Sequence, residues 1–328
     1  MNFKGHFSYL IWLKAGCIQY LRYKLLVLLQ IAHHTAYIHP IPSGHRFPML
    51  KYELIPAQLL HMGIVGKEHF FTPQKATREI IGLAHDLTYV DHLLQLTLEP
   101  SMIRRIGFPM SQSLVDRELY LIDGTVQSAL HALEHQVSFN TAGGTHHAGK
   151  DFGEGFCLLN DQAVAAAYLF QQQLAKKILI VDLDVHQGNG TAHIFEGHPA
   201  INTFSIHAAR NFPFKKEHST IDIALPDGIE DEAYLSLLNE ALNSCISSLK
   251  PDFVFYQAGV DVLATDQLGK FKLSLTGCKA RDQLVFQLCK FHQIPVQVSM
   301  GGGYSKDIKD IVNAHVNTFS AAIDIFDL

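Results

Sequence analysis

The segment DLDVH at 182–186 spaces three ionisable side chains two residues apart, directly after an apolar run. In an extended chain Asp182, Asp184 and His186 would share one side, a costly arrangement unless a cation neutralises them. Aspartate oxygens and a histidine nitrogen suit zinc, and a catalytic zinc takes three protein ligands and leaves one position open. Asp261, which follows another apolar run, is the candidate third ligand. For this motif alone the alternative is a turn whose side chains bond only to loop amides.

Two further motifs carry groups that handle protons and carbonyls. His146 and His147 follow GGT, and a neutral imidazole near a metal can act as a general base while a second one carries a proton. The segment GGGY at 301–304 places the Tyr304 hydroxyl on a glycine-rich turn, where it would polarise a carbonyl. Taken alone, each is an ordinary loop feature. The chain lacks GxSxG, Walker A and HExxH patterns, which removes common hydrolase and NTPase classes.

The elements that must position these groups alternate between short apolar runs and helical patterns. Helices are predicted at 160–175, capped by Asn160 or Asp161, and at 231–249. The predicted strands are 25–32, 137–140, 178–185, 201–207, 252–259 and 295–302. This alternation favours a single-domain, doubly wound α/β fold with a mostly parallel sheet flanked by helices. In such a sheet the loops after the strands meet at one edge, which is where all the motifs above lie.

The composition is that of a globular chain: of 328 residues, 48% are hydrophobic and 17% are charged. A formal net charge of -5 gives no basic face, so we predict no direct binding to nucleic acid. Five cysteines without a CxxC pair indicate a reducing compartment and no thiolate metal cage. The unusual count is 20 histidines, which directs attention to the places where histidine lies beside aspartate and glycine.

The N-terminal stretch is apolar but interrupted by Lys14, Arg22 and Lys24. Its longest uncharged run is too short to span a bilayer, and no signal-peptide cleavage site follows, so we expect no transmembrane segment. We interpret residues 1–24 as an extension packed on one domain over 25–328, with membrane-surface binding as the alternative. No targeting signal is visible, which favours the cytoplasm, although secretion as a bacterial effector stays open. The sequence gives no indication of oligomeric state.

Taken together, the motifs resemble the histone deacetylase family within the arginase/deacetylase fold. The matching segments occur in family order: GGTHHAG at 143–149, GEGFCLLND at 153–161, VDLDVHQGNGT at 181–191, FSIH at 204–207, YQAGVDVLATDQLG at 256–269 and GGGY at 301–304. The resemblance is strongest to class IV and its bacterial relatives, because Gln187 and Asn189 stand where class I enzymes have histidine and aspartate. It makes residues 25–328 a histone-deacetylase-like catalytic domain.

The resemblance implies two cation sites. Asp184, His186 and Asp261 match the zinc ligands of the family. A second, structural cation, usually potassium, lies near the same strand ends. The residues that match its surroundings are Asp182, Asp184, His186, Ser205 and Ile206.

The resemblance also implies the catalytic roles. His147 matches the base that activates water, His146 its tandem neighbour, and Asp182 the carboxylate that orients His146. Tyr304 matches the carbonyl-polarising tyrosine, and Asn189 replaces the carboxylate of the second histidine pair. An asparagine stabilises imidazolium less than a carboxylate does, which would lower the basicity of that histidine. The residues that match the walls of the acyl-lysine channel are Gly155, Phe156, Phe212 and Gly303.

The function implied is zinc-dependent hydrolysis of acyl groups from lysine side chains of proteins, with long fatty acyl groups favoured over acetyl as in class IV. One alternative keeps the chemistry but takes small amides such as acetylpolyamines. Another, of a different class, is a catalytically silent interaction module. Use of two manganese ions, as in arginases, is disfavoured because these loops supply too few carboxylates.

Overall fold

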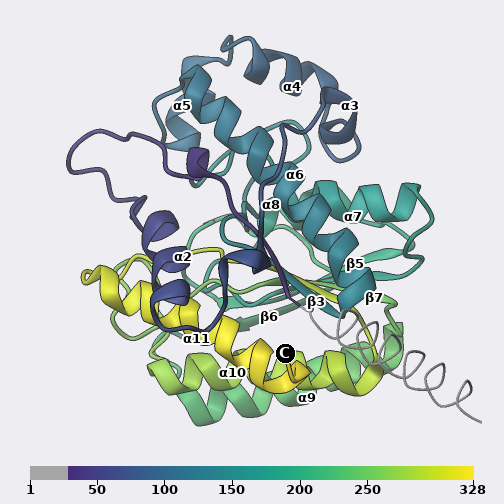
Figure 1. Ribbon diagram of the computed structural model, residues 1–328. Helices are drawn as coiled ribbons and strands as arrows, with labels where there is room; N and C mark the ends of the chain where they lie inside the picture. The colour runs from purple at the N-terminus through teal and green to yellow at the C-terminus, as the bar shows by residue number, and fades with distance from the viewer. Residues whose placement is uncertain (1–28) are drawn as a thin grey trace, which may run out of the picture.

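The structure, a computed structural model, describes residues 29–328 (Figure 1). Its centre is one eight-stranded sheet in the order β2-β1-β3-β8-β7-β4-β5-β6, in which every pair of neighbours is parallel. The strands are β1 (Gln30–Ala32), β2 (Phe70–Phe71), β3 (Val137–Asn140), β4 (Ile178–Asp182), β5 (Ile201–Ala208), β6 (Ile221–Leu225), β7 (Phe253–Gln257) and β8 (Val296–Ser299). The predicted α/β fold is confirmed.

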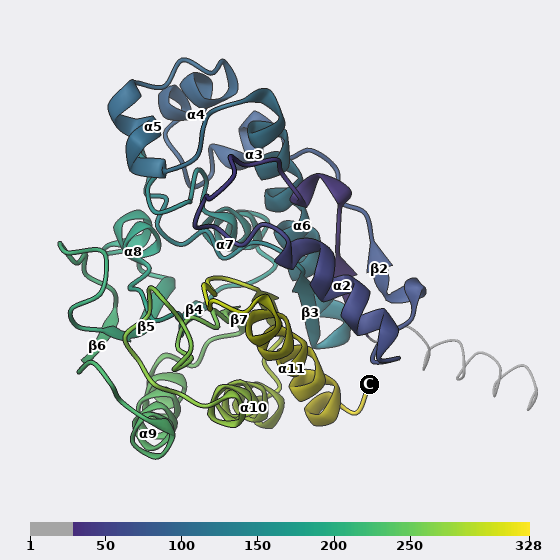
Figure 2. The same ribbon diagram turned by 90° about the vertical axis from the view of Figure 1, so that its left-hand side faces the viewer.

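Helices cover both faces of the sheet, as the two views agree (Figures 1 and 2). One face carries α2 (Lys51–His61), α9 (Asp231–Leu249), α10 (Leu275–His292) and α11 (Ile308–Phe326). The other carries α6 (Gln112–His135), α7 (Asp161–Gln171) and α8 (Asn189–Phe195), with α3 (Arg78–Ile81), α4 (Leu87–Leu94) and α5 (Pro100–Ile106) beyond them. Two short 3-10 helices, η1 (Thr35–Tyr37) and η2 (Lys67–His69), complete the set.

Alternate residues of β4 and of β7 enter opposite cores. Leu179 and Val181 of β4 belong to the core beside α9, α10 and α11, whereas Ile178 and Ile180 belong to the core beside α6 and α7. Both faces are therefore apolar, which is why these strands read as continuous hydrophobic runs in the sequence. In these two strands the last residue, Asp182 or Gln257, is the first with a charged or amide side chain.

Most predicted elements are present, with shifted ends. Helix α9 has the predicted bounds, and α7 begins as predicted with the Asn160 side chain accepting from the amide of Ala163, but it ends at Gln171. Of the first predicted strand, Gln30–Ala32 is observed. Residues 25–28, like the predicted extension over residues 1–24, lie outside the described part of the chain.

The predicted strand 178–185 is too long, because β4 ends at Asp182. Its side chains turn the backbone: Asp182 Oδ1 accepts from the amide of Asp184 at 3.1 Å, and Asp184 Oδ1 accepts from the amide of His186 at 3.0 Å. Aspartate carboxylates compete with the sheet ladder in this way. Leu183 and Val185 still enter the core beside α9, α10 and α11, whereas Asp184 and His186 line a cavity, so the alternation inferred from the sequence survives in the turn.

Candidate active site and metal centre

Four loops meet at the carboxyl-terminal edge of the sheet. They follow β3, β8, β7 and β4, which are adjacent in that order. These are the loops that carry the tandem histidines, GGGY, Asp261 and DLDVH. Residues from all four line one cavity of about 510 Å³, so the topology gathers motifs that are far apart in the chain.

At the floor of this cavity Asp184, His186 and Asp261 form a buried cluster. His186 Nδ1 lies 3.0 Å from Asp184 Oδ1 and 3.0 Å from Asp261 Oδ2. Backbone amides hold the two carboxylates: Gly302 donates to Asp184 Oδ2 and Val185 donates to Asp261 Oδ1, both at 2.9 Å. Of the two interpretations left open by the sequence, the turn is observed, and it arranges the same side chains as a ligand cluster.

The cluster fits a divalent cation. Its ligand atoms lie within 4.8 Å of one another, and all three residues are buried. Burial and the negative charge of the neighbouring Asp184 raise the pKa of Asp261 to about 7, and a divalent cation bound by both carboxylates would relieve this repulsion. Two aspartates and one histidine are a donor set that zinc accepts.

Glycines let the backbone lie against the ligands. A Cβ at Gly259 would be 2.1 Å from Asp184 Oδ2, and one at Gly302 would be 2.1 Å from Asp261 Oδ2. Any side chain at either position would push a carboxylate out of place.

The tandem histidines have different partners. His146 Nδ1 lies 2.7 Å from Asp182 Oδ2; burial opposes its charged form, but the charges of Asp182 and Asp184 outweigh burial and raise its pKa to about 9. His147 Nδ1 lies 2.6 Å from Asn189 Oδ1. Burial, with the positive charge of His146 and His186, holds the pKa of His147 well below its usual value. The pairings expected for His146 and His147 are therefore both present in the geometry.

Tyr304 and three of the four predicted channel residues line the same cavity as the cluster. Burial, with Asp261 and Asp184, raises the pKa of Tyr304 well above its usual value, so the hydroxyl keeps its proton and can donate. Its amide donates to Asp266 Oδ2 at 2.6 Å, and its ring lies 6.1 Å from that of Phe156. Phe212 meets the His147 ring edge-on at 5.0 Å. Gly155, Phe156 and Phe212 line the cavity.

Gly303 was expected to line the channel, but it is not among the residues that line the cavity. A Cβ there would meet Val260 at 2.7 Å and Ile311 at 3.1 Å, so this residue faces the core. Of the residues predicted near the structural cation, Asp182 and Ser205 are register partners on β4 and β5, and Ile206 follows on β5. Ser205 Oγ also lies 3.0 Å from His207 Nδ1.

Two carboxylates of the site escaped the sequence reasoning, although both lie in the quoted segment 153–161. Glu154 Oε1 accepts from Asn189 Nδ2 at 2.7 Å. Asp161 Oδ1 accepts from the amides of Gly144 and Thr145 at 2.9 Å each, which fixes the turn before the tandem histidines. The signal for both was an acidic residue inside an otherwise apolar or glycine-rich motif.

The histone deacetylase domain, as a family model, matches residues 45–319. The chain belongs to the histone deacetylase family. An uncharacterized protein of Picosynechococcus is 45% identical over 296 residues, covering 90% of this chain and 99% of that protein. Histone deacetylase 2 of Arabidopsis thaliana is 26% identical, covering 85% of this chain and 75% of its own. Human histone deacetylase 1 is also 26% identical, covering 86% of this chain and 61% of its own.

Solved structures share the histone deacetylase fold. The crystal structure of the HDA15 HD domain matches with a TM-score of 0.73 at 22% identity, covering 90% of this chain and 95% of that one. Histone deacetylases hydrolyse amides, so this member is a hydrolase of the deacetylase type. They generally use zinc, which the buried Asp184–His186–Asp261 cluster fits.

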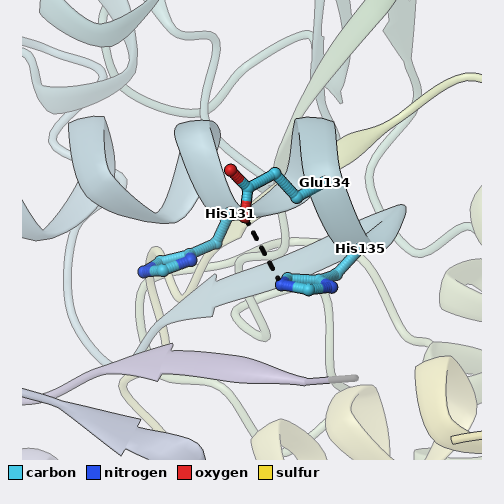
Figure 3. Close-up of side chains that lie close together, drawn as sticks. All are labelled: His131, Glu134 and His135. Atoms are coloured by element: carbon cyan, nitrogen blue, oxygen red, sulfur yellow. Dashed lines mark ion pairs between the residues drawn. The ribbon is translucent and has the colours of Figure 1, made fainter. Parts of the chain in front are cut away.

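A second group of possible ligands lies on the surface of α6. Among the described residues, His131, Glu134 and His135 also bring ligand atoms within 4.8 Å of one another (Figure 3). Glu134 is 74% exposed, and its carboxylate lies 3.7 Å from His135 Nε2.

No helix of residues 29–328 is long and apolar enough to cross a membrane.

Proposed function

We propose that this histone deacetylase homologue is a zinc-dependent lysine deacylase, which hydrolyses N-ε-acyl-lysine in proteins to free lysine and a carboxylic acid. The observation that carries the proposal is the placement of His147 and Tyr304 in one cavity with the buried Asp184–His186–Asp261 cluster. The catalytic unit is residues 25–328, with residues 1–24 as an extension, and the compartment is the cytoplasm.

We assign the zinc ion and the structural potassium ion to two different sets of residues. Zinc held by Asp184, His186 and Asp261 would supply Lewis acidity toward the amide carbonyl and the attacking water. A structural potassium ion would lie by Asp182, Ser205 and Ile206, where β4 and β5 run side by side.

The protein groups supply proton handling and orientation. With Nδ1 bonded to Asn189, His147 has Nε2 free to accept a proton from water. The Tyr304 hydroxyl donates a hydrogen bond to the amide oxygen as charge develops there. His146, whose charged form Asp182 favours, holds the proton that the departing amine requires. Water adds its oxygen to the carbonyl carbon as His147 takes the proton, and the carbon–nitrogen bond then breaks to give lysine and the carboxylate.

The cavity supports acyl-lysine as substrate. Apolar rings, among them Phe47, Phe156 and Phe212, line it together with polar groups. Apolar walls suit an acyl chain, and we propose a preference for long fatty acyl groups over acetyl.

The charge of the lining weighs against acetylpolyamines. Five of its side chains are exposed cations, Arg46, Arg104, Arg105, Arg210 and Lys270, and the last three pair with only two carboxylates, Glu154 and Asp227. The carboxylates of the same lining, Asp184 and Asp261, are buried at the floor. A polycationic amine would meet like charge on entry, whereas an acyl-lysine flanked by acidic residues would meet opposite charge.

The test is turnover on one lysine peptide carrying an acetyl, octanoyl or myristoyl group, with and without a zinc chelator. Chelator-sensitive cleavage that rises with chain length supports the full proposal. Equal rates on all three peptides would retain the deacylase and remove the chain-length preference. An acetylpolyamine at equal concentration is the comparison substrate, and preferential cleavage of it would overturn the protein substrate. No cleavage of any of them by zinc-loaded protein would favour the interaction module.

A further inference from the structure

A buried chain of polar groups runs outward from His147 through Asn189 to Glu154. His147 Nδ1 lies 2.6 Å from Asn189 Oδ1, and Asn189 Nδ2 donates to Glu154 Oε1 at 2.7 Å. The second oxygen of Glu154 accepts from Arg105 Nε at 2.5 Å. We infer that Glu154 is a positioning residue: it fixes the amide of Asn189 and, through it, the tautomer of His147. The inference rests on the proposed function only in giving His147 the role of base.

Hydrogen-bond donors and acceptors determine how the amide of Asn189 is oriented. A carboxylate only accepts, so Glu154 requires the amide nitrogen of Asn189 to face it. The amide oxygen of Asn189 must then face His147, which requires a proton on Nδ1 of that ring. Nε2 is left as the acceptor. An asparagine without such a partner can rotate by half a turn and present its nitrogen to the ring, which favours the opposite tautomer.

Glu154 is held firmly enough to have this effect. Its side chain is 9% exposed and pairs with Arg105, whose guanidinium also lies 4.2 Å from the centre of the Phe152 ring. The amide of Gly155 donates to the carbonyl of Arg105 at 3.1 Å, which ties the loop to the end of α5. The carboxylate is therefore fixed by its neighbours on both sides before any substrate enters.

The two histidines thus each have a carboxylate, at different distances. Asp182 contacts His146 directly, whereas Glu154 acts on His147 across one amide. The asparagine at 189 therefore does not leave His147 without an oriented acceptor.

The experiment exchanges the carboxylate at position 154 and the amide at position 189. Glu154→Gln can face Asn189 with either end of its amide, so the orientation of Asn189 is no longer imposed; we expect kcat to fall about tenfold with KM and zinc content unchanged. Asn189→Asp alone places two carboxylates in contact and also lowers kcat. In the double variant Glu154→Gln/Asn189→Asp, the new carboxylate at position 189 accepts from His147, and the new amide at position 154 donates to that carboxylate. We expect the kcat of the double variant to recover to within about threefold of the unmodified protein.

A second readout does not depend on activity. With histidine rings labelled with ¹⁵N, the His147 resonances, identified by their loss in His147→Gln, report which nitrogen carries the proton. We expect protonated Nδ1 in the unmodified protein and in the double variant, and a mixture in Glu154→Gln. Glu99→Gln, an exposed carboxylate before α5, is the matched control and should change neither readout.

These outcomes separate the positioning role of Glu154 from the proposed deacylase function. If Glu154→Gln keeps both the ¹⁵N pattern and kcat, or if the double variant is no better than Asn189→Asp, the positioning role is wrong. If Glu154→Gln fails to fold, the comparison of Asn189→Asp with the double variant still decides. Absence of turnover in the unmodified protein, with the expected ¹⁵N pattern, contradicts the proposed function and leaves the positioning role standing.

Discussion

Two places in the described part of this molecule bring three potential metal ligands within 4.8 Å of one another, and they differ in every other respect. The group on α6, His131, Glu134 and His135, comes from one helical turn, where residues three and four apart are neighbours in any helix (Figure 3). The floor of the cavity, by contrast, joins Asp184 and His186 to a residue about 75 positions away, Asp261.

The difference shows when a cluster of potential metal ligands requires a cation to neutralise its charge. On α6 water reaches Glu134, so its charge is already solvated. At the cavity floor Asp184 and Asp261 are almost wholly buried, backbone amides fix the carboxylates, and two negative charges lie together with one imidazole. Proximity alone is a consequence of helix geometry, whereas burial makes neutralisation necessary. Substitutions at the two clusters and around them test this distinction.

Asp261→Asn should abolish tight zinc binding and reduce deacylase activity to background, because it removes one of three ligands and leaves the others intact. Zinc content by atomic absorption and turnover on an acylated peptide are the measurements. Glu134→Gln on α6 is the matched control and should keep both. A variant at Asp261 that retained one zinc per chain and full turnover would place the metal elsewhere.

Tyr304→Phe should retain zinc and lose turnover by roughly 100-fold to 1,000-fold, since it removes only a donor to the developing oxyanion. Circular dichroism and zinc content check that the fold and the metal are kept. Tyr168→Phe on α7 serves as the control for loss of a hydroxyl. Unchanged kcat in Tyr304→Phe would remove this residue from the chemistry.

Lowering the pH should reduce the free energy of unfolding, because His85 is buried in its neutral form beside the site. His85 Nδ1 donates to the carbonyl of Gly149 and Nε2 accepts from the amide of Asn160, each at 2.9 Å, and burial lowers its pKa to about 4. The unfolded chain therefore binds this proton more readily, so the stabilisation is complete above pH 6.5 and is lost as pH falls toward 4.

The size of this effect can be measured by urea unfolding at pH 7 and pH 5. For a shift from 6.5 to about 4, His85 contributes a loss of about 2 kcal/mol between these two pH values. In His85→Asn the free energy of unfolding should fall by correspondingly less over the same interval. His135→Asn on α6 should keep the full dependence, and an equal pH dependence in all three proteins would contradict the assignment to His85.

The smallest effect is expected on α6. Replacing both His131 and His135 by alanine should leave deacylase activity and one tightly bound zinc per chain unchanged, and should alter the free energy of unfolding by no more than about 0.5 kcal/mol. Loss of the tight zinc in this double variant would reverse the comparison between the two clusters.

Much of the site followed from the chain itself. Apolar runs indicated the central strands, and the polar residues after them indicated Asp184, His186, Asp261, the tandem histidines and Tyr304. This works best for β4 and β7, which are buried against apolar cores on both faces, so that the first charged or amide side chain marks the strand end. The short edge strand β2 and the half-buried β6 carry no such signal and were not predicted.

Some features were decided only by the tertiary structure. The sequence showed Asn189 as a missing carboxylate, but only the folded loop brings Glu154 within 2.7 Å of it and restores an oriented acceptor. In the same way the sequence placed Gly303 at the channel, whereas packing turns it toward Val260. Residue types and spacing determine which groups a chain offers and on which strand ends they begin. Loop conformation determines which of them touch, because those contacts depend on hydrogen bonds between residues that are distant in the chain.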